Sequence, residues 1–173
     1  GPLCVVHFDA HTDVYPPAWD CNVHHGTFMR LAHERGWLQP DGVLQIGVRG
    51  HFASAEDVQA PSKLGFRVMT TDDIQTGGLN KARQAIEQLP KGPTYVTFDI
   101  DCLDPAYAPG TGTPVPGGLS SWQAMQLLQH LASRHIVGGD VVEVAPAYDH
   151  GDITALAAAS ILWEMLALLA KKQ

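Results

Sequence analysis

The sequence predicts an α/β fold in which a mainly parallel sheet lies between two layers of helices, and three observations support it. Short apolar runs alternate with segments of helical periodicity along the 173 residues, which is the pattern of repeated βα units. The first run, residues 3–8, is almost unbroken in its apolar character, as expected of a strand covered on both faces. Acidic residues directly follow two of the runs, where parallel sheets bind their ligands.

In the first half of the chain we expect three strands, at residues 3–8, 43–48 and 66–69. Residues 14–24 contain two adjacent prolines and no periodicity, which predicts a loop. A helix is expected over 25–35 because Gly36 supplies its end, with Phe28, Leu31 and Ala32 on one side. A second helix is expected over 79–89, with Pro90 as its stop.

The second half continues the same alternation. A central strand at 95–98 precedes a loop over 108–118, whose three prolines and four glycines exclude a helix or an inner strand. Ser120 and Gln123 form a capping box that opens a helix to about residue 133. After a strand at 139–144, either Asp149 or Asp152 caps a last helix that runs to Leu169.

Composition predicts a single soluble domain over residues 1–173, with 45% hydrophobic and 17% charged residues. The net charge of −7 argues against nucleic acid and anionic membrane surfaces, and it favours cationic ligands. No apolar run reads as a membrane span, because polar residues interrupt the nearest one at 153–170. The three cysteines lack C-x-x-C spacing, which indicates reduced thiols and a cytoplasmic protein. Because the chain opens directly in a core strand, we expect the domain to be N-terminally incomplete.

Two acidic clusters carry the candidate chemistry. Asp9, His11 and Asp13 follow the first strand, and Asp99 and Asp101 follow the central one. Alternate residues of an extended chain share a face, so we expect each cluster to point one way. Carboxylates held that close repel one another unless a cation or a proton lies between them. Oxygen and imidazole donors without thiolate favour manganese, with iron, cobalt and zinc as alternatives. We therefore predict one shared metal site.

Two further residues near these strand ends are interpreted as structural rather than catalytic. His7 has the parity of Asp9 but lies deeper in the strand, which indicates a core histidine. Arg49, which follows the second strand, is expected to form a structural ion pair.

Four segments carry a family resemblance: Asp9-Ala10-His11-Thr12-Asp13, His25-Gly26-Thr27, the run from Phe98 to Gly118, and Asp140-Val141-Val142-Glu143-Val144-Ala145-Pro146. They resemble the ureohydrolases, the arginase and agmatinase family, over essentially the whole chain, and residues 147–159 are particularly similar to bacterial agmatinases. The resemblance implies the three-layer arginase-like fold and a cytoplasmic homo-oligomer, trimeric or hexameric, that serves polyamine biosynthesis.

The resemblance also implies a centre of two manganese ions. Asp9, His11, Asp99 and Asp101 match the complete ligand set of one ion. Asp9, Asp13 and Asp99 match three of the four ligands of the other. In that family the fourth ligand is a histidine from an upstream Gly-Gly-Asp-His segment, which this sequence does not contain.

The implied reaction is attack of a metal-held hydroxide on a guanidinium carbon, which releases urea and an amine. Asp13 would bind the hydroxide and pass its proton to the leaving nitrogen. Glu143 would accept hydrogen bonds from the planar guanidinium. His25 resembles the family's proton-shuttling histidine, with His24 as the alternative, and Thr113 would help to shape the guanidinium pocket.

The loop over 14–24 indicates the substrate, because it has no Lys or Arg and contains Asp20. An acidic loop suits an amine tail rather than a carboxylate, so we expect agmatine, cleaved to putrescine and urea, with guanidinobutyrate and arginine as alternatives. Two other functions stay open. One is a zinc deacetylase of the same fold, which would use the His24-His25-Gly26 element, and the other is an inactive chain that retains the latter half of the fold.

Overall fold

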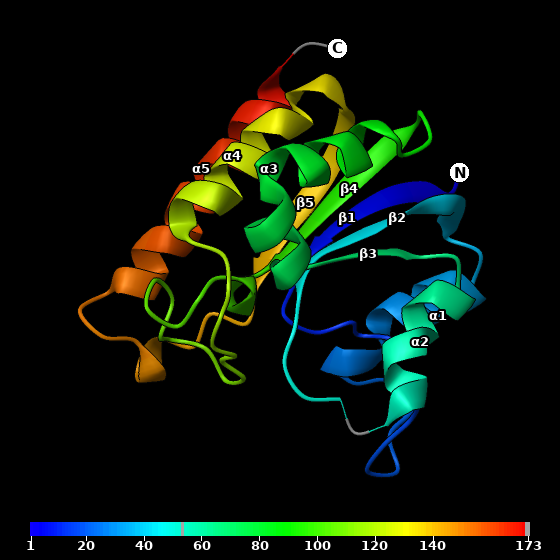
Figure 1. Ribbon diagram of the computed structural model, residues 1–173, viewed down its shortest axis with the longest axis horizontal. Helices are drawn as coiled ribbons and strands as arrows, with labels where there is room; N and C mark the ends of the chain where they lie inside the picture. Colours follow the sequence, from blue (N-terminus) through cyan, green and yellow to red (C-terminus); the bar gives the residue numbers. More distant parts are fainter. Residues whose placement is uncertain (53, 172–173) are drawn as a thin grey trace.

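A computed structural model, which describes residues 1–52 and 54–171, shows a five-stranded parallel sheet between two layers of helices (Figure 1). The strand order is β3-β2-β1-β4-β5. The strands are β1 (Leu3–Phe8), β2 (Leu38–Val48), β3 (Arg67–Thr70), β4 (Pro93–Asp99) and β5 (His135–Val142). The helices are α1 (Phe28–Glu34) and α2 (Ala55–Lys63) on one face, and α3 (Thr71–Glu87), α4 (Ser121–His130) and α5 (Ile153–Ala170) on the other. The predicted three-layer α/β class is confirmed.

The two faces of the sheet bury separate cores. Phe8 of β1 and Phe98 of β4 stack at 4.9 Å between ring centroids within the larger core, which α3, α4 and α5 cover. On the opposite face Val5 packs with Met29 and Phe66 in the smaller core. The register pairs Phe8 with Phe98. β1 ends at Phe8 and β4 one residue further on, at Asp99, so Asp9 and Asp99 lie side by side at the same edge of the sheet.

The structure extends or corrects several predicted elements. α2 was not predicted, and it begins with a capping box of Ser54 and Asp57. α3 begins at Thr71 rather than residue 79, because a Thr70 cap opens it and the chain kinks at Gly78, where φ is 73°. In α1 the buried side chain is Met29, whereas Phe28, on the predicted apolar side, is exposed.

The start of α5 settles the choice between two caps. The Asp149 carboxylate accepts hydrogen bonds from the backbone N–H groups of Thr154 and Ala155, both at 3.0 Å, whereas Asp152 makes no side-chain cap. α5 is long and apolar enough to cross a membrane by length and composition, but a single such helix is weak support for a membrane span. Its buried residues, Met165 and Leu168 among them, belong to the larger core.

Candidate metal centre

Of the two acidic clusters only Asp99, the last residue of β4, lies in a strand, and the other four residues lie in turns, which corrects the parity argument. β1 ends at Phe8, and residues 100–102 form a short 3-10 turn after β4. In each turn the strand-end carboxylate accepts a hydrogen bond from the backbone two residues on. Oδ1 of Asp9 accepts from the N–H of His11 at 2.6 Å, and Oδ1 of Asp99 accepts from the N–H of Asp101 at 3.0 Å. These local bonds, typical of aspartate at turns, bend each chain back on itself.

Asp101 joins the two turns to each other. Its Oδ1 accepts a hydrogen bond from the N–H of Ala10 at 3.1 Å. Its Oδ2 lies 3.2 Å from Nδ1 of His11 and accepts from Oγ1 of Thr113 at 3.1 Å. The same nitrogen of His11 lies 3.2 Å from Oδ1 of Asp9. Thr113 thus contacts a carboxylate of the centre, from the glycine- and proline-rich loop.

Two groups of donor atoms are close enough to share a cation. The atoms of Asp9, His11 and Asp101 lie within 4.8 Å of one another, and so do those of His7, Asp9 and Asp13. Asp99 belongs to neither group, but its charge interacts with those of Asp9, Asp13 and Asp101. The structure therefore brings together four of the five predicted ligands and places the fifth beside them.

The charges of this centre are strongly coupled. Burial and the charges of Asp9 and Asp101 raise the pKa of Asp99 to about 10. Burial and Asp9 likewise raise the pKa of Asp13 to about 8. Hydrogen bonds to Asp101 and Asp9 raise the pKa of His11 to about 10. Crowded carboxylates of this kind hold protons unless a cation replaces them.

A second observation also shows that these donor atoms suit a divalent metal ion. Oδ2 of Asp9 is buried and accepts no well-aligned hydrogen bond from the residues that the structure describes, although Nε2 of His7 lies 2.8 Å away. A buried carboxylate oxygen with a free lone pair is costly unless a cation or donor satisfies it. Carboxylates and imidazole without thiolate suit a hard or borderline metal.

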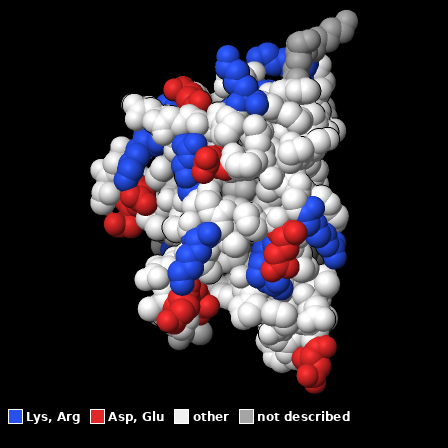
Figure 2. Space-filling view, turned by 90° about the vertical axis from the view of Figure 1, so that its right-hand side faces the viewer, with Lys and Arg blue, Asp and Glu red and all other residues white. Residues whose placement is uncertain are grey.

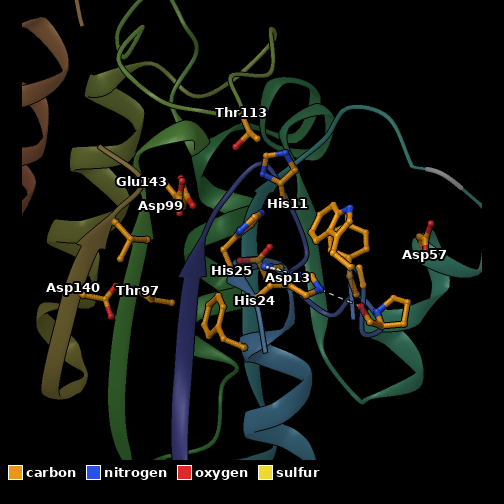
Figure 3. Close-up of a pocket in the computed structure, with 17 residues that line it drawn as sticks. His11, Asp13, His24, His25, Asp57, Thr97, Asp99, Thr113, Asp140 and Glu143 are labelled. Atoms are coloured by element: carbon orange, nitrogen blue, oxygen red, sulfur yellow. Dashed lines mark hydrogen bonds between the residues drawn. The ribbon is translucent and has the colours of Figure 1, made fainter. Parts of the chain in front are cut away.

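The centre opens into a cavity of about 770 Å³. His11, Asp13 and His25 lie together in its middle, Thr113 lies above them, and Glu143 lies to one side (Figure 3). His24 is occupied elsewhere, because its Nδ1 accepts from the N–H of Gly26 at 3.2 Å as a helix cap. Both histidines line the cavity, and His25, which is exposed, is the one that does not serve as the cap.

Two predicted catalytic residues adopt left-handed backbone conformations. φ is 50° at Asp13 and 61° at Glu143, a region that residues with a side chain rarely occupy. Glu143 immediately follows β5 and is exposed to the cavity, whereas Asp13 is buried at its floor. Such strain persists where the surroundings fix it, and it concentrates at functional sites.

Several residues around the site differ from the predictions. Arg49 makes no ion pair among the described residues; its guanidinium instead donates to backbone carbonyls, including those of Asp101 at 2.7 Å and Val115 at 2.6 Å. Asp20 is not part of the cavity lining, whereas Asp57 and Asp140 are. Asp57 was missed because its helix was not predicted.

Comparison with known proteins gives consistent matches. A model of the Arginase family matches residues 1–167. The agmatinase of Enterobacter sp. (strain 638) is 46% identical over 174 residues, which cover 100% of this chain and 54% of that protein. The structure of proclavaminate amidino hydrolase from Streptomyces clavuligerus matches with a TM-score of 0.92 and 42% identity, over 98% of this chain and 57% of that one. The structure of agmatine ureohydrolase from Thermoplasma volcanium matches with a TM-score of 0.84 and 29% identity, over 96% of this chain and 55% of that one. The chain thus spans about half the length of these relatives.

Proposed function

Because the chain belongs to the arginase family, we propose that it forms the metal centre of a ureohydrolase that cleaves agmatine to putrescine and urea. The observation that carries the proposal is the meeting of Asp9, His11 and Asp101 from two strand ends, beneath a cavity that also contains Glu143. The relatives named agmatinase and agmatine ureohydrolase support the same reaction.

The proposed centre holds two manganese ions. Asp9, His11, Asp99 and Asp101 would bind one ion, and Asp9, Asp13 and Asp99 would bind the other, whose fourth ligand this chain lacks. Bound ions of this kind lower the pKa of water, so that it attacks an electrophilic carbon at neutral pH.

The side chains around the centre would orient the substrate and move its proton. The Glu143 carboxylate faces the cavity and suits a planar guanidinium, which donates two parallel hydrogen bonds to a carboxylate. Asp13 lies on the cavity floor and would carry a proton to the leaving nitrogen. His25, whose side chain is exposed, would exchange that proton with solvent.

The cavity lining favours agmatine over substrates that carry a carboxylate. No Lys or Arg lines the cavity within the described ranges 1–52 and 54–171. Tyr15, Trp19 and Phe28 supply an apolar wall for the methylene chain, and Asp57 lies on the side opposite Glu143 (Figure 3). A guanidinium at Glu143 and an ammonium toward Asp57 would fit these charges, whereas the carboxylates of arginine and guanidinobutyrate would meet acidic groups.

We also propose a cytoplasmic homo-oligomer, trimeric or hexameric, that contributes to putrescine synthesis. A small cationic substrate agrees with the net charge of −7. Figure 2 shows acidic and basic side chains interspersed on one face, without a continuous basic patch that nucleic acid or an anionic membrane would require.

The test is urea release by the 173-residue chain supplied with manganese. Agmatine should give a higher kcat/KM than arginine or guanidinobutyrate, and Asp101→Ala should abolish turnover. Higher kcat/KM with arginine would contradict the substrate. Amide hydrolysis with one zinc and no urea would favour the deacetylase. If the folded chain binds manganese but shows no turnover, the chain is inactive and retains only the fold.

A further inference from the structure

A buried polar chain lies directly behind the metal centre. His7 of β1 and Gln45 of β2 are paired by the strand register, and both are almost fully buried. Nε2 of Gln45 lies 3.0 Å from Nδ1 of His7 and donates to the carbonyl of Thr12 at 2.6 Å. The other ring nitrogen, Nε2 of His7, lies 2.8 Å from Oδ2 of Asp9. The chain therefore runs from the turn that follows β1, through Gln45 and His7, to a carboxylate of the centre.

Distance alone would make His7 a metal ligand. Its donor atom lies within 4.8 Å of those of Asp9 and Asp13, and one proposed ion lacks a ligand in this chain. The hydrogen bonds decide otherwise. The Thr12 carbonyl can only accept, so the Gln45 atom that faces it is the amide nitrogen rather than the amide oxygen.

The orientation of Gln45 then fixes the protons of His7. The same amide nitrogen has no lone pair to offer, so Nδ1 of His7 must accept its second hydrogen. A neutral imidazole carries one proton, which leaves it on Nε2, facing Asp9. A protonated Nε2 has no lone pair for a metal.

We propose that His7 is a positioning residue rather than a metal ligand, and that Gln45 fixes its tautomer so that Nε2–H holds the carboxylate of Asp9 in place. The proposal rests on the metal centre proposed above. Oδ1 of Asp9 is held by the N–H of His11, so His7 supplies the constraint on the other oxygen. Nε2 of His7 lies 2.8 Å from Oδ2 without forming a well-aligned hydrogen bond, which leaves that oxygen a lone pair for a cation. Mutation of a residue that hydrogen-bonds to a metal ligand typically lowers metal affinity about 10- to 100-fold.

The test uses the 173-residue chain and two independent readouts. Titration calorimetry with Mn²⁺ should show about 10- to 100-fold weaker binding for His7→Phe and Gln45→Met, with the number of bound ions unchanged. Tyr95→Phe is the matched control, because it removes a hydroxyl from β4 that donates to Asp140, and its affinity should equal that of the wild type. Nitrogen-15 spectra of the His7 ring should show a protonated Nε2 that persists when diamagnetic Zn²⁺ is added.

The outcomes separate this proposal from the metal centre itself. Loss of the Nε2 proton on addition of Zn²⁺ would make His7 a ligand and overturn the proposal. Unchanged Mn²⁺ affinity in folded variants would overturn it as well. If His7→Phe does not fold, Gln45→Met and the wild-type spectra still decide. Absence of Mn²⁺ binding by the wild type would overturn the centre and this role together, whatever tautomer the spectra show.

Discussion

Nδ1 of His11 lies 3.2 Å from Oδ2 of Asp101, although the two residues follow different strands. This contact joins the turn after β1 to the turn after β4, and it places an imidazole and a carboxylate where one cation can meet both. The first prediction tests that junction directly.

Manganese should stabilise the wild-type chain, and Asp101→Asn should lose that effect. A ligand at 100 times its Kd stabilises the folded state by about 2.7 kcal/mol. Thermal unfolding with and without Mn²⁺ measures it. Asp152→Asn is the control, because Asp152 makes no side-chain cap and lies outside the cavity lining. An equal shift for wild type and Asp101→Asn would place the manganese elsewhere.

Glu143→Gln should weaken agmatine binding to the manganese-loaded chain. The loss of a charge-assisted hydrogen bond costs about 1.5–3 kcal/mol, which is roughly a 10- to 100-fold rise in Kd. Titration calorimetry with agmatine is the measurement, and Glu56→Gln, on the exposed first turn of α2, is the control. Equal affinities for the two variants would remove Glu143 from the guanidinium site.

Asp57→Asn should reduce affinity for agmatine more than Asp20→Asn does. Asp57 lines the cavity and Asp20 does not, so only the former can attract the ammonium end of the substrate. An exposed charge pair contributes about 0.2–1 kcal/mol, so the expected rise in Kd is up to about fivefold. The effect should be absent for butylguanidine, which has no ammonium. A larger effect from Asp20→Asn would show that the ammonium end of agmatine binds at the loop over 14–24 instead.

Arg49→Lys should lower the free energy of unfolding by about 2–3 kcal/mol, as measured by urea denaturation. Its guanidinium binds carbonyls of β2, of the turn after β4 and of the loop over 108–118, including those of Gly47, Asp101 and Val115. A lysine cannot reproduce this planar fork, which leaves partly buried carbonyls unpaired. Arg35→Lys, at an exposed residue whose guanidinium lies over Trp37, is the control. A change no larger than that of the control would show that the network is dispensable.

The Asp149 cap predicts a pH dependence of stability. Although burial opposes it, hydrogen bonds from Thr154 and Ala155 lower the pKa of Asp149 to about 2 from an ordinary value of 3.8. A depressed pKa contributes stability above pH 4 that is lost as the pH falls toward 2. Urea denaturation between pH 6 and pH 3 should therefore show that the difference between wild type and Asp149→Asn shrinks with falling pH. A constant difference would exclude the charged cap.

The sheet and the strand ends could be predicted from the sequence because their signal is local. Residues 3–8 and the run before Asp99 are continuous apolar segments, and acidic residues follow them immediately. Helix caps with their partner three residues away, such as Ser120 with Gln123, are local in the same way. Only the part of α3 after the kink was predicted, because Gly77 and Gly78 oppose a helix locally and the turns before Gly78 depend on the Thr70 cap.

Contacts that depend on strand register could not be predicted. His7 looks like an ordinary core histidine until the pairing of β1 with β2 sets Gln45 opposite it. Extended-strand parity also failed for Asp101, because the turn that carries it forms from a hydrogen bond to Asp99 rather than from alternation along a strand. The convergence of the site was thus foreseen for a reason that is only partly correct.

A crystal structure of the chain with manganese, with anomalous diffraction recorded at the manganese edge, tests the central claim most directly. The account predicts a peak bounded by Asp9, His11 and Asp101, where the turns after β1 and β4 meet. A chain of unchanged fold whose manganese binds only outside that cluster, or not at all, would contradict it.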